Sequence, residues 1–469
     1  MSRTRVLLIN PPIREAAPPS SIPIGLASIA AVLRNAGHDV DVLDVNGLRM
    51  PFEQVQRRLA GRPYDLVAAG GLITTYAYLK KLFPAIRRAQ PEALLVIGGG
   101  VCVEPDVVLE NLDVDLCVIG EGEYTMRDLA EAVGDRPDWK EIPGLAWRGP
   151  DGVAWSDPRP LEKDLDRFPL PAYDLLPVAA YNANVFLSGE KSEVNIITSR
   201  GCPWDCSFCW HIFGRGMRLR GVEAVLDEIQ YFREKHGIAS ILFADENFTA
   251  NRKRLVELCE GLIRAGHSRL PWMCSGRADT VDDEVLKIMR RAGCYRVNFG
   301  VESGCQRLLD SMNKRIKKER VAEAIGLCRK HRIIPGGTLI FGMPGEDESS
   351  IGETVAFCRA HRLATGMFFA TPYPGTDLYK DPEVFRKILA RYGTKDAFFT
   401  VLGDAKDYVI NLTDLPDDEM MRLKVASDRQ TKYQSVFSMA RIGVDSLRSR
   451  GWARTARLYW EWVLARLRR

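Results

Sequence analysis

The segment that decides the fold is Gly201-Cys202-Pro203-Trp204-Asp205-Cys206-Ser207-Phe208-Cys209-Trp210, in which three cysteines have the spacing C-x3-C-x2-C. Iron–sulfur clusters are normally held by four cysteine thiolates, and a structural zinc site needs four ligands. Three neighbouring thiolates without an evident fourth would leave one iron of a four-iron cluster open to a small molecule. The spacing therefore favours an iron–sulfur cluster over a structural zinc site or incidental buried cysteines.

A series of alternating strands and helices surrounds this segment. The predicted strands are Val194–Thr198, Ile241–Ala244, Trp272–Ser275, Arg296–Gly300, Gly337–Phe341 and Thr365–Ala370. A helical pattern follows most of them, so six βα units predict an open, partial (β/α)6 barrel whose functional edge is made by the carboxyl ends of the strands. The cysteines follow the first strand, which would place a cluster at the mouth of the barrel.

A second alternating series occupies the N-terminal part of the chain. Its predicted strands are Val6–Ile9, Val40–Leu43, Leu66–Ala69, Leu94–Ile97 and Leu116–Ile119, and helical patterns such as Ile24–Asn35 and Tyr76–Ala89 separate them. This order predicts a parallel sheet with crossover helices, in which ligands bind at the carboxyl edge. No loop has the G-x-G-x-x-G pattern followed by a ribose-binding acid, so a nicotinamide site is poorly supported.

The whole chain is predicted to be α/β. We expect a Rossmann-like parallel-sheet domain at residues 1–149, a partial barrel at residues 191–380 and a mainly helical region at residues 381–469. Residues 150–190 are rich in proline and have few periodic segments, which is typical of a linker.

The bulk composition is that of an ordinary globular protein, with 46% hydrophobic and 27% charged residues. A net charge of +4 indicates no polyanionic partner. We expect no secretory signal and no membrane span, and eleven cysteines without a small-domain framework indicate a reducing, cytoplasmic environment. The cysteines expected to be plain core residues are Cys259, Cys274, Cys294, Cys328 and Cys358.

Residues 191–378 resemble the core of the radical S-adenosylmethionine (SAM) superfamily. The resemblance implies a [4Fe–4S] cluster held by Cys202, Cys206 and Cys209, with SAM chelating the open iron and yielding a 5′-deoxyadenosyl radical after one-electron reduction. It also implies an electron donor such as flavodoxin or ferredoxin. The polypeptide would supply orientation and exclude water.

The same resemblance implies SAM-binding roles for five residues. Phe208 would pack near the adenine, Glu246 would face the amino group, and Arg277 would bind the carboxylate. Glu302 would face SAM from the fourth strand, and Ile340 lies in the motif at residues 338–346 that resembles the adenine motif of the fifth strand. A surface ion pair for Arg277 and a structural role for Glu302 remain the alternatives.

Residues 1–135 resemble the cobalamin-binding domain that precedes many radical SAM cores. The motifs behind this likeness are Asn10-Pro11-Pro12, Ile24-Gly25-Leu26, Gly98-Gly99-Gly100 and Gly120-Glu121-Gly122-Glu123. Glycine in such loops lets the backbone approach the nucleotide tail of the corrin closely. The residues to which the resemblance assigns cobalamin binding are Asn10, Gly25, Gly99, Gly100, Gly120 and Gly122. Tight βα turns without a ligand are the alternative.

The Asp-x-His-x-x-Gly signature, which donates a histidine to cobalt in mutase-type domains, is missing. His38 precedes the second strand, at the wrong edge of the sheet, and we expect it to be a surface turn residue. The loop Leu72-Ile73-Thr74, after the third strand, is the candidate for the lower cobalt face. A weakly ligating face of this kind favours the loss of a methyl group to a radical.

Two reaction classes fit this architecture, and the motifs serve both. We favour an enzyme that abstracts hydrogen from an unactivated carbon through a 5′-deoxyadenosyl radical and transfers a methyl group from methylcobalamin. An oxygen-independent oxidative cyclase, or another cobalamin-assisted radical oxidation, is the alternative, and a cobalamin sensor or carrier is the non-enzyme alternative. A methylthiotransferase is disfavoured because the N-terminal region has only Cys102 and Cys117, too few for a second cluster. We assign no residue a catalytic role, and this applies to His211 as well.

The segment 441–469 is basic and carries one apolar stripe at helical spacing. A helix docked on the barrel and an interfacial helix on anionic lipid are both interpretations of this pattern. We therefore expect a small-molecule substrate, with a lipid-like one if the segment meets the membrane surface, and no nucleic-acid partner.

Overall fold

The computed structural model describes residues 3–13, 19, 21–134, 138–181 and 193–431. The chain divides into two compact units. The first comprises Met1–Ala183, Val194–His236 and Thr371–Ile410, and the second comprises Asn184–Glu193, Gly237–Ala370 and Asn411–Arg469. The four-part division expected from the sequence stays a prediction, since the compact units join segments that are far apart along the chain.

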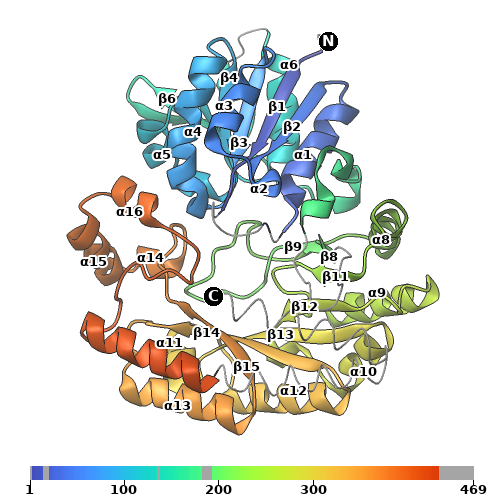
Figure 1. Cartoon of the computed structure of the whole chain (residues 1–469), viewed down its shortest axis with the longest axis vertical. Coiled ribbons are helices and arrows are strands. Elements are labelled where there is room, and N and C mark those ends of the chain that lie inside the picture. Colours follow the sequence, from blue (N-terminus) through green and yellow to red (C-terminus); the bar gives the residue numbers. More distant parts are fainter. Residues whose placement is uncertain (1–2, 14–18, 20, 135–137, 182–192, 432–469) are drawn as a thin grey trace. The chain divides into compact units, whose positions relative to one another are not determined.

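The first unit is built on a seven-stranded sheet with the order β2-β1-β3-β4-β5-β6-β7 (Figure 1). Its strands are β1 (Arg5–Asn10), β2 (Asp39–Asp44), β3 (Leu66–Gly70), β4 (Leu94–Gly98), β5 (Leu116–Val118), β6 (Leu145–Gly149) and β7 (Gly152–Trp155). The first five are parallel, which confirms the predicted parallel sheet, and β6 and β7 add to β5 in antiparallel orientation. Strand β7 lies within the predicted linker, so that stretch begins with ordered sheet.

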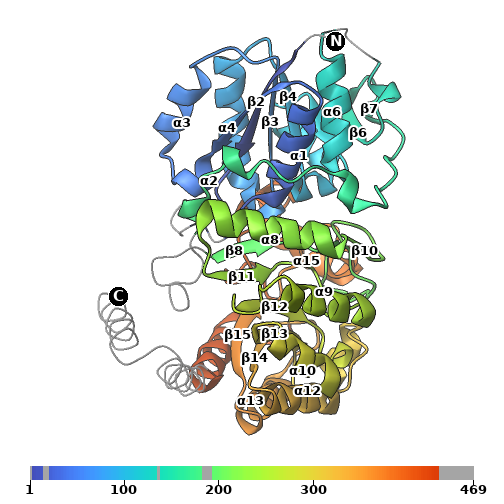
Figure 2. The same cartoon turned by 90° about the vertical axis from the view of Figure 1, so that its right-hand side faces the viewer.

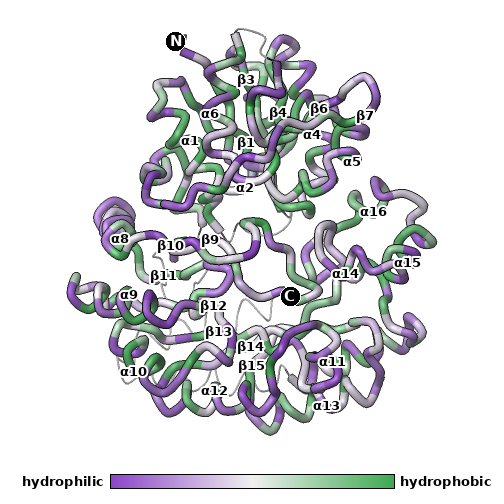
Figure 3. Tube along the Cα trace, turned by 180° about the vertical axis from the view of Figure 1, so that it is seen from behind, coloured by the Kyte–Doolittle hydropathy of each residue, from purple (hydrophilic) through white to green (hydrophobic). Residues whose placement is uncertain are grey.

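Helices cover both faces of this sheet. Figure 2 shows α1 and α6 on one face and α3 and α4 on the other. The helices that follow the parallel strands are α1 (Ile24–Asn35), α2 (Val45–Leu48), α3 (Phe52–Leu59), α4 (Tyr76–Ala89), α5 (Pro105–Asn111) and α6 (Gly122–Ala132). Because both faces are covered, the inner strands β1, β3, β4 and β5 are nearly continuous hydrophobic runs, whereas the edge strand β2 alternates aspartate with apolar residues (Figure 3).

The core beneath α1 and α6 follows the two-residue period of the strands. Val6 and Leu8 of β1 lie on the α1 side together with Leu33 of α1 and Leu129 of α6, and all four are buried. The intervening Leu7 is also buried. Alternate strand residues therefore fill two hydrophobic layers, one on each face of the sheet.

The cysteine segment belongs to the first unit. Strands β9 (Ser199–Arg200) and β10 (Arg218–Leu219) pair in antiparallel orientation, and the loop that joins them, residues 201–217, holds all three cysteines. The other elements described in this unit are the helices α8 (Val222–His236), α14 (Asp377–Lys380), α15 (Pro382–Tyr392) and α16 (Lys395–Val401), and the 3-10 turns η1 (Ile73–Thr75), η2 (Gly100–Val103), η3 (Trp139–Glu141), η4 (Leu165–Arg167), η5 (Tyr173–Leu175) and η6 (Val178–Ala180).

The second unit contains five neighbouring parallel strands in the order β15-β14-β13-β12-β11. The strands are β11 (Ser240–Phe243), β12 (Trp272–Gly276), β13 (Cys294–Glu302), β14 (Ile334–Phe341) and β15 (Ala364–Phe369). The helices are α9 (Arg252–Arg264), α10 (Asp283–Arg291), α11 (Gln306–Ser311), α12 (Lys318–Lys330) and α13 (Glu348–Ala360), with the 3-10 turn η7 (Ala278–Thr280) after β12. A further helix at residues 417–431 belongs to this unit.

The sixth predicted strand of this series is β8 (Glu193–Ile196), which precedes the cysteine segment. With β11 to β15, all six predicted strands are present. The predicted α/β fold class is therefore confirmed, with a parallel N-terminal sheet, a βα series from β8 to β15 and helices after it. The five predicted core cysteines of the second unit are fully buried. Burial raises the pKa of the Cys358 thiol to about 12, so this thiol stays protonated at neutral pH.

None of the described helices is both long and apolar enough to cross a bilayer. The segment 441–469 lies outside the described residues.

Candidate functional site

The cysteine loop is closed tightly at its base. Gly201 has φ +93°, and a Cβ atom added there would lie 2.2 Å from the carbonyl oxygen of Gly216. The two ends of the loop therefore touch backbone to backbone, which only glycine permits. Within the loop, the Cys209 amide donates a hydrogen bond to the Cys206 carbonyl at 3.0 Å.

The three thiols differ in exposure, and all eleven cysteines are outside disulfides. Cys206 is buried, Cys202 is partly exposed, and Cys209 is exposed. No group of three or more His, Cys, Asp or Glu side chains among the described residues is arranged to hold a single metal ion. The case for a cluster therefore depends on three closely spaced soft thiol donors at one accessible loop.

Trp210, directly after the last cysteine, fits between two glycines of the same unit. A Cβ atom added to Gly100 would lie 2.3 Å from Cζ3 of the indole, and one added to Gly375 would lie 2.7 Å from its Nε1. Gly100 follows β4 at the carboxyl edge of the N-terminal sheet. The cysteine loop thus reaches the predicted cobalamin loop through an indole ring that needs glycine on both sides.

The loops after β3 and β4 approach each other through their backbones. A Cβ atom on Gly70 would lie 2.2 Å from the Gly98 carbonyl oxygen, and the Val101 amide donates to the Gly71 carbonyl at 3.0 Å. Gly99 has φ +83°, in the left-handed region that favours glycine. This edge is a cradle in which added side chains would meet backbone.

The predicted lower-face residues lie beside this cradle, after β3. Leu72 is 46% exposed and Ile73 is buried. The Thr74 hydroxyl is buried and has no hydrogen-bond partner in the described structure. A buried hydroxyl without a partner is uncommon in proteins, so the Thr74 hydroxyl has hydrogen-bonding capacity left for a ligand. The cradle and this hydroxyl fit a bulky, partly polar cofactor such as cobalamin.

The remaining predicted cobalamin residues have different environments. The Asn10 amide donates to Asp44 at 2.7 Å and to the Tyr181 hydroxyl at 3.1 Å, so the side chain is already engaged. Gly25 is exposed at the start of α1 with open space where a Cβ atom would point. Gly120 has φ +82° and the same open space.

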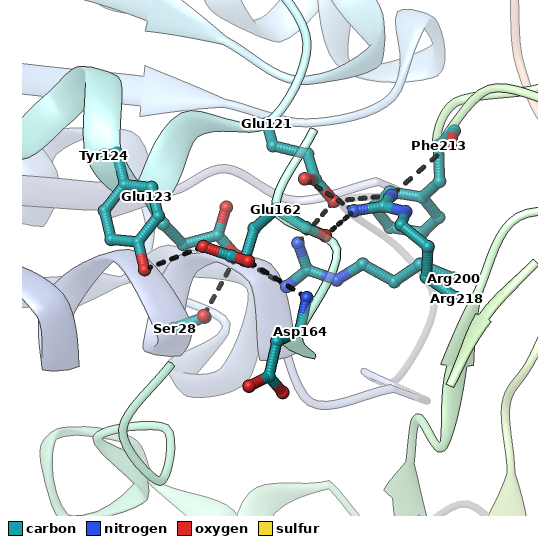
Figure 4. A network of polar contacts seen from close by, with 9 residues as sticks. All are labelled: Ser28, Glu121, Glu123, Tyr124, Glu162, Asp164, Arg200, Phe213 and Arg218. Carbon is teal, nitrogen blue, oxygen red and sulfur yellow. Dashed lines mark hydrogen bonds and ion pairs between the residues drawn. The ribbon is translucent and has the colours of Figure 1, made fainter. Parts of the chain in front are cut away.

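Glu121, between the predicted glycines Gly120 and Gly122, binds both strands at the base of the cysteine loop (Figure 4). It accepts from Arg200 at 2.7 Å and from Arg218 at 2.8 and 2.9 Å. Arg200 also donates to Glu123 at 2.5 Å, and Glu123 accepts from the Ser28 hydroxyl at 3.0 Å. Burial raises the pKa of the Glu121 carboxyl, but the bonds from Arg218 and Arg200 outweigh burial and hold the pKa below its usual value.

The expectation that His38 is a surface turn residue is wrong. His38 is 5% exposed, and both ring nitrogens are buried without a hydrogen-bond partner in the described structure. The residue lies two positions before the buried Val40 of β2, and residues two apart share a face of a strand. Burial lowers the pKa of the imidazole, against the opposing effect of Glu131.

Two of the predicted SAM-binding positions, Arg277 and Glu302, lie at strand ends of the second unit and are connected there. The buried Arg277, after β12, donates to Asp279 at 2.9 and 2.8 Å and to the Lys314 carbonyl at 2.8 Å. The Lys314 ammonium in turn contacts the Glu302 carboxylate at 2.8 Å. Arg277 and Glu302, predicted from different strands, are therefore connected through Lys314.

Glu302 ends β13 in a conformation that non-glycine residues rarely adopt. Its φ is +61°, and the pairing of β13 with β14 shifts register between Gly300 and Glu302. A Cβ atom added to Gly300 would lie 2.3 Å from the Glu302 carboxylate. Strained residues beside bulges concentrate at functional sites, where the bulge redirects a side chain.

The other predicted positions are less distinctive. Glu246 is exposed after β11, whereas its neighbour Asp245 is buried. Phe208 is partly exposed in the cysteine loop, and Ile340 is partly exposed in β14. His211 has a buried Nε2 without a partner in the described structure, and burial lowers its pKa.

Sequence reasoning missed the residues that hold these segments in place. Arg200, Arg218, Lys314 and Asp279 are ordinary charged residues in the sequence. Three of them had one signal, a position beside predicted site residues, since Arg200 and Arg218 flank the cysteine loop and Asp279 follows Arg277 by two. Lys314 had none.

Glu346, at the end of the predicted adenine motif, yields a pH-dependent prediction. Burial raises the pKa of its carboxyl from 4.5 to about 7, although backbone amides of Gly342 and Met343 oppose this. The folded state thus binds a proton more tightly than the unfolded state, and stability falls as pH rises from about 4.5 through about 7.

We expect Glu346→Gln to remove this fall, which amounts to about 3 kcal/mol. Urea denaturation of wild type and variant at pH 5 and pH 8 measures it. Equal pH dependence in the two proteins would contradict the prediction.

Comparisons with known proteins identify the families that both parts of the chain match. A family model of the radical SAM superfamily matches residues 196–358, and a model of the B12 binding domain matches residues 12–130. An uncharacterized methyltransferase of Pyrococcus horikoshii is 31% identical over 392 residues, which are 81% of this chain and 83% of that protein. The anaerobic magnesium-protoporphyrin IX monomethyl ester cyclase of Rubrivivax gelatinosus is 29% identical over 371 residues, 76% of this chain and 66% of that protein.

Solved structures with a similar fold include a radical SAM methyltransferase. The radical SAM methyltransferase TsrM from Kitasatospora setae superposes with a TM-score of 0.68 at 22% identity, covering 80% of this chain and 75% of that one.

Proposed function

The chain belongs to the radical SAM enzymes that carry a B12 binding domain, and on this premise we propose that it methylates an unactivated carbon of a small molecule. The cofactors of this family are a [4Fe–4S] cluster, SAM and cobalamin. When bound, the cluster and SAM supply the radical that removes hydrogen, and cobalamin supplies the methyl group. The observation that carries the proposal is the contact of Trp210 with Gly100, which brings the cysteine loop to the cobalamin edge within one compact unit.

In this proposal Cys202, Cys206 and Cys209 hold the cluster and leave one iron for SAM. The accessible Cys209 and the buried Cys206 give the loop one face toward solvent and one toward the protein. Trp210 fills the space between its two glycines and so keeps water from that part of the loop. Exclusion of water protects a radical from side reactions.

We propose that SAM is oriented by Phe208, Glu246, Arg277, Glu302 and Ile340. Lys314 holds the Glu302 carboxylate and Asp279 holds the Arg277 guanidinium, so both groups are oriented before a ligand arrives. Such preorganised charges cost little rearrangement during the reaction.

We propose that cobalamin lies against Asn10, Gly25, Gly99, Gly100, Gly120 and Gly122, with Leu72, Ile73 and Thr74 facing cobalt. None of these three side chains carries an imidazole, and His38 precedes β2 at the opposite edge of the sheet. The cobalt would therefore be weakly ligated from the protein side.

Methyl transfer is favoured over oxidative cyclisation because the methyltransferase relative matches this chain over the larger share of both proteins. Anaerobically reconstituted protein with SAM, a reductant and substrate extracts from its producing cells tests the choice. A methylase forms S-adenosylhomocysteine and 5′-deoxyadenosine together. Formation of 5′-deoxyadenosine alone in the presence of a consumed substrate would support the cyclase instead, and formation of neither would support a sensor or carrier.

We further propose a flavodoxin- or ferredoxin-type electron donor. Contact of residues 441–469 with anionic lipid, and hence a lipid-like substrate, is a separate proposal that rests on the apolar stripe and arginines of that segment.

A further inference from the structure

We infer that Glu121 couples cobalamin binding to the stability of the cysteine loop, so that each cofactor strengthens retention of the other. The inference rests on the proposed function, because it takes the loop at Gly120–Gly122 to face cobalamin and residues 202–209 to hold the cluster. Glu121 acts here as a positioning residue, through its bonds to Arg200 and Arg218.

The first step of the argument is the geometry at the base of the cysteine loop. Arg200 and Arg218 are direct cross-strand partners, one on each side of residues 201–217. A single carboxylate, Glu121, accepts hydrogen bonds from both guanidinium groups, at 2.7 to 2.9 Å (Figure 4). The same carboxylate therefore ties the two strands from which the whole loop emerges.

The second step is the strength of these bonds. The side chains of Glu121, Arg200 and Arg218 are only 8%, 12% and 14% exposed. The charges are also balanced locally, because Arg200 reaches Glu123 as well. Charge-assisted bonds that are bidentate and shielded from water are the strongest and most directional in proteins. Screening by salt, which weakens surface ion pairs, has little access to this network.

The third step is the position of Glu121 in the N-terminal sheet. It follows β5 at the carboxyl edge, with Gly120 on one side and the first residue of α6, Gly122, on the other. Gly120 holds a left-handed backbone with open space beside it. A ligand that orders these two glycines therefore orders the carboxylate between them, with no intervening segment.

The cysteine loop meets the same edge a second time, through Trp210 on Gly100. The base of the loop and the residue after its last cysteine are thus both fastened to glycine loops of the sheet. Ordering of these loops by cobalamin restrains residues 201–210 at both ends. By linkage, any gain in affinity for the cluster on cobalamin binding equals the gain in cobalamin affinity on cluster binding.

The test measures this coupling in the full-length protein with its cluster reconstituted anaerobically. Iron release to a colorimetric ferrous chelator is timed with and without saturating hydroxocobalamin, and cobalamin affinity is measured by equilibrium dialysis with and without the cluster. We expect the cluster to raise the cobalamin affinity of the wild type by about 10-fold, within the usual range of such couplings, and cobalamin to slow its iron release. We define the coupling ratio as the rate of iron release without cobalamin divided by the rate with it. In Glu121→Gln this ratio is expected to fall below about 2-fold, since two guanidinium groups then share a neutral amide.

The coupling ratio is used because Glu121→Gln can change the retention of the cluster or the affinity for cobalamin directly. Only a loss of coupling between the two changes the ratio. Asp174→Asn is the matched control, because it removes an exposed ion pair with Arg34 in the same unit, and its ratio should equal that of the wild type. Arg218→Lys keeps the charge but loses the bidentate bond. If Glu121→Gln unfolds, the ratio is measured in Arg218→Lys instead.

An undiminished ratio in both Glu121→Gln and Arg218→Lys would overturn the inference, as would a wild type that binds both cofactors independently. Failure of the proposed function gives a different result, namely a wild type that binds no cobalamin or forms no cluster.

Discussion

Cys206→Ser is expected to leave the protein without its iron–sulfur cluster and with 5′-deoxyadenosine formation lowered by more than about 100-fold. Cys206 is the buried member of the triad, and a serine oxygen is a poor donor for the soft iron–sulfur core. Loss of an outer-shell partner alone costs 10- to 100-fold in metal affinity, so loss of a ligand should lower activity by more than about 100-fold. Iron content, the EPR signal of the reduced cluster and 5′-deoxyadenosine formation measure the effect.

Cys358→Ala is the matched control for this variant. Cys358 is a buried core thiol of α13, and the alanine removes one atom from the core without touching the cysteine loop. We expect this control to keep its iron and its EPR signal, at a stability cost of about 1 kcal/mol. A Cys206→Ser protein that retained about four iron atoms and its EPR signal would contradict the assignment of the cluster to this loop.

Lys314→Met is expected to destabilise the second unit by about 3–5 kcal/mol, the usual cost of leaving one partner of a buried ion pair alone. The side chains of Lys314 and Glu302 are 6% and 8% exposed, and their charged atoms lie 2.8 Å apart. Methionine keeps most of the length of lysine but supplies no charge to the Glu302 carboxylate. The shift of the urea denaturation midpoint, multiplied by the slope m, gives the difference in the free energy of unfolding.

Two comparisons separate this effect from a general loss of packing. Arg307→Met removes an exposed pair, with side chains 55% and 52% exposed, and should cost no more than about 1 kcal/mol. The double variant Glu302→Gln with Lys314→Met should recover part of the loss, because no charge is then left buried. A cost for Lys314→Met as small as that for Arg307→Met would show that the buried pair contributes little.

If Glu302 also faces SAM, as proposed, Lys314→Met has a second consequence. The carboxylate would lose the ammonium that orients it beside a strained backbone. We therefore expect weaker SAM binding in those Lys314→Met molecules that remain folded, read by equilibrium dialysis under conditions where the variant is native.

Much of the architecture could be predicted from periodicity. The helix Ile24–Asn35 and the strand ends at Asn10, Gly70 and Gly98 follow from runs of apolar residues bounded by turn residues. The burial of Cys274 and Cys294 follows from their place in strands covered by helices. These features depend on neighbours within a few positions, where the repeat of a strand or a helix leaves a direct pattern.

The strand β7 and the burial of His38 could not be read in this way. β7 is four residues long and lies in a proline-rich stretch, so its place at the sheet edge comes from pairing with β6 rather than from its own pattern. His38 precedes a strand by one residue, and the buried face of that strand continues through it.

By itself the sequence determined the α/β class, the two βα series and the three cysteines after the first barrel strand, because each depends on residues close together in the chain. The partners of the charged residues were decided only by the tertiary structure. Arg218 and Glu121 are 97 positions apart, and Arg200 and Glu121 are 79 apart, yet they meet within 3 Å. A charged residue looks the same in the sequence whether it faces water or a buried opposite charge. Only the folded chain, which removes water and brings one partner close, distinguishes the two cases.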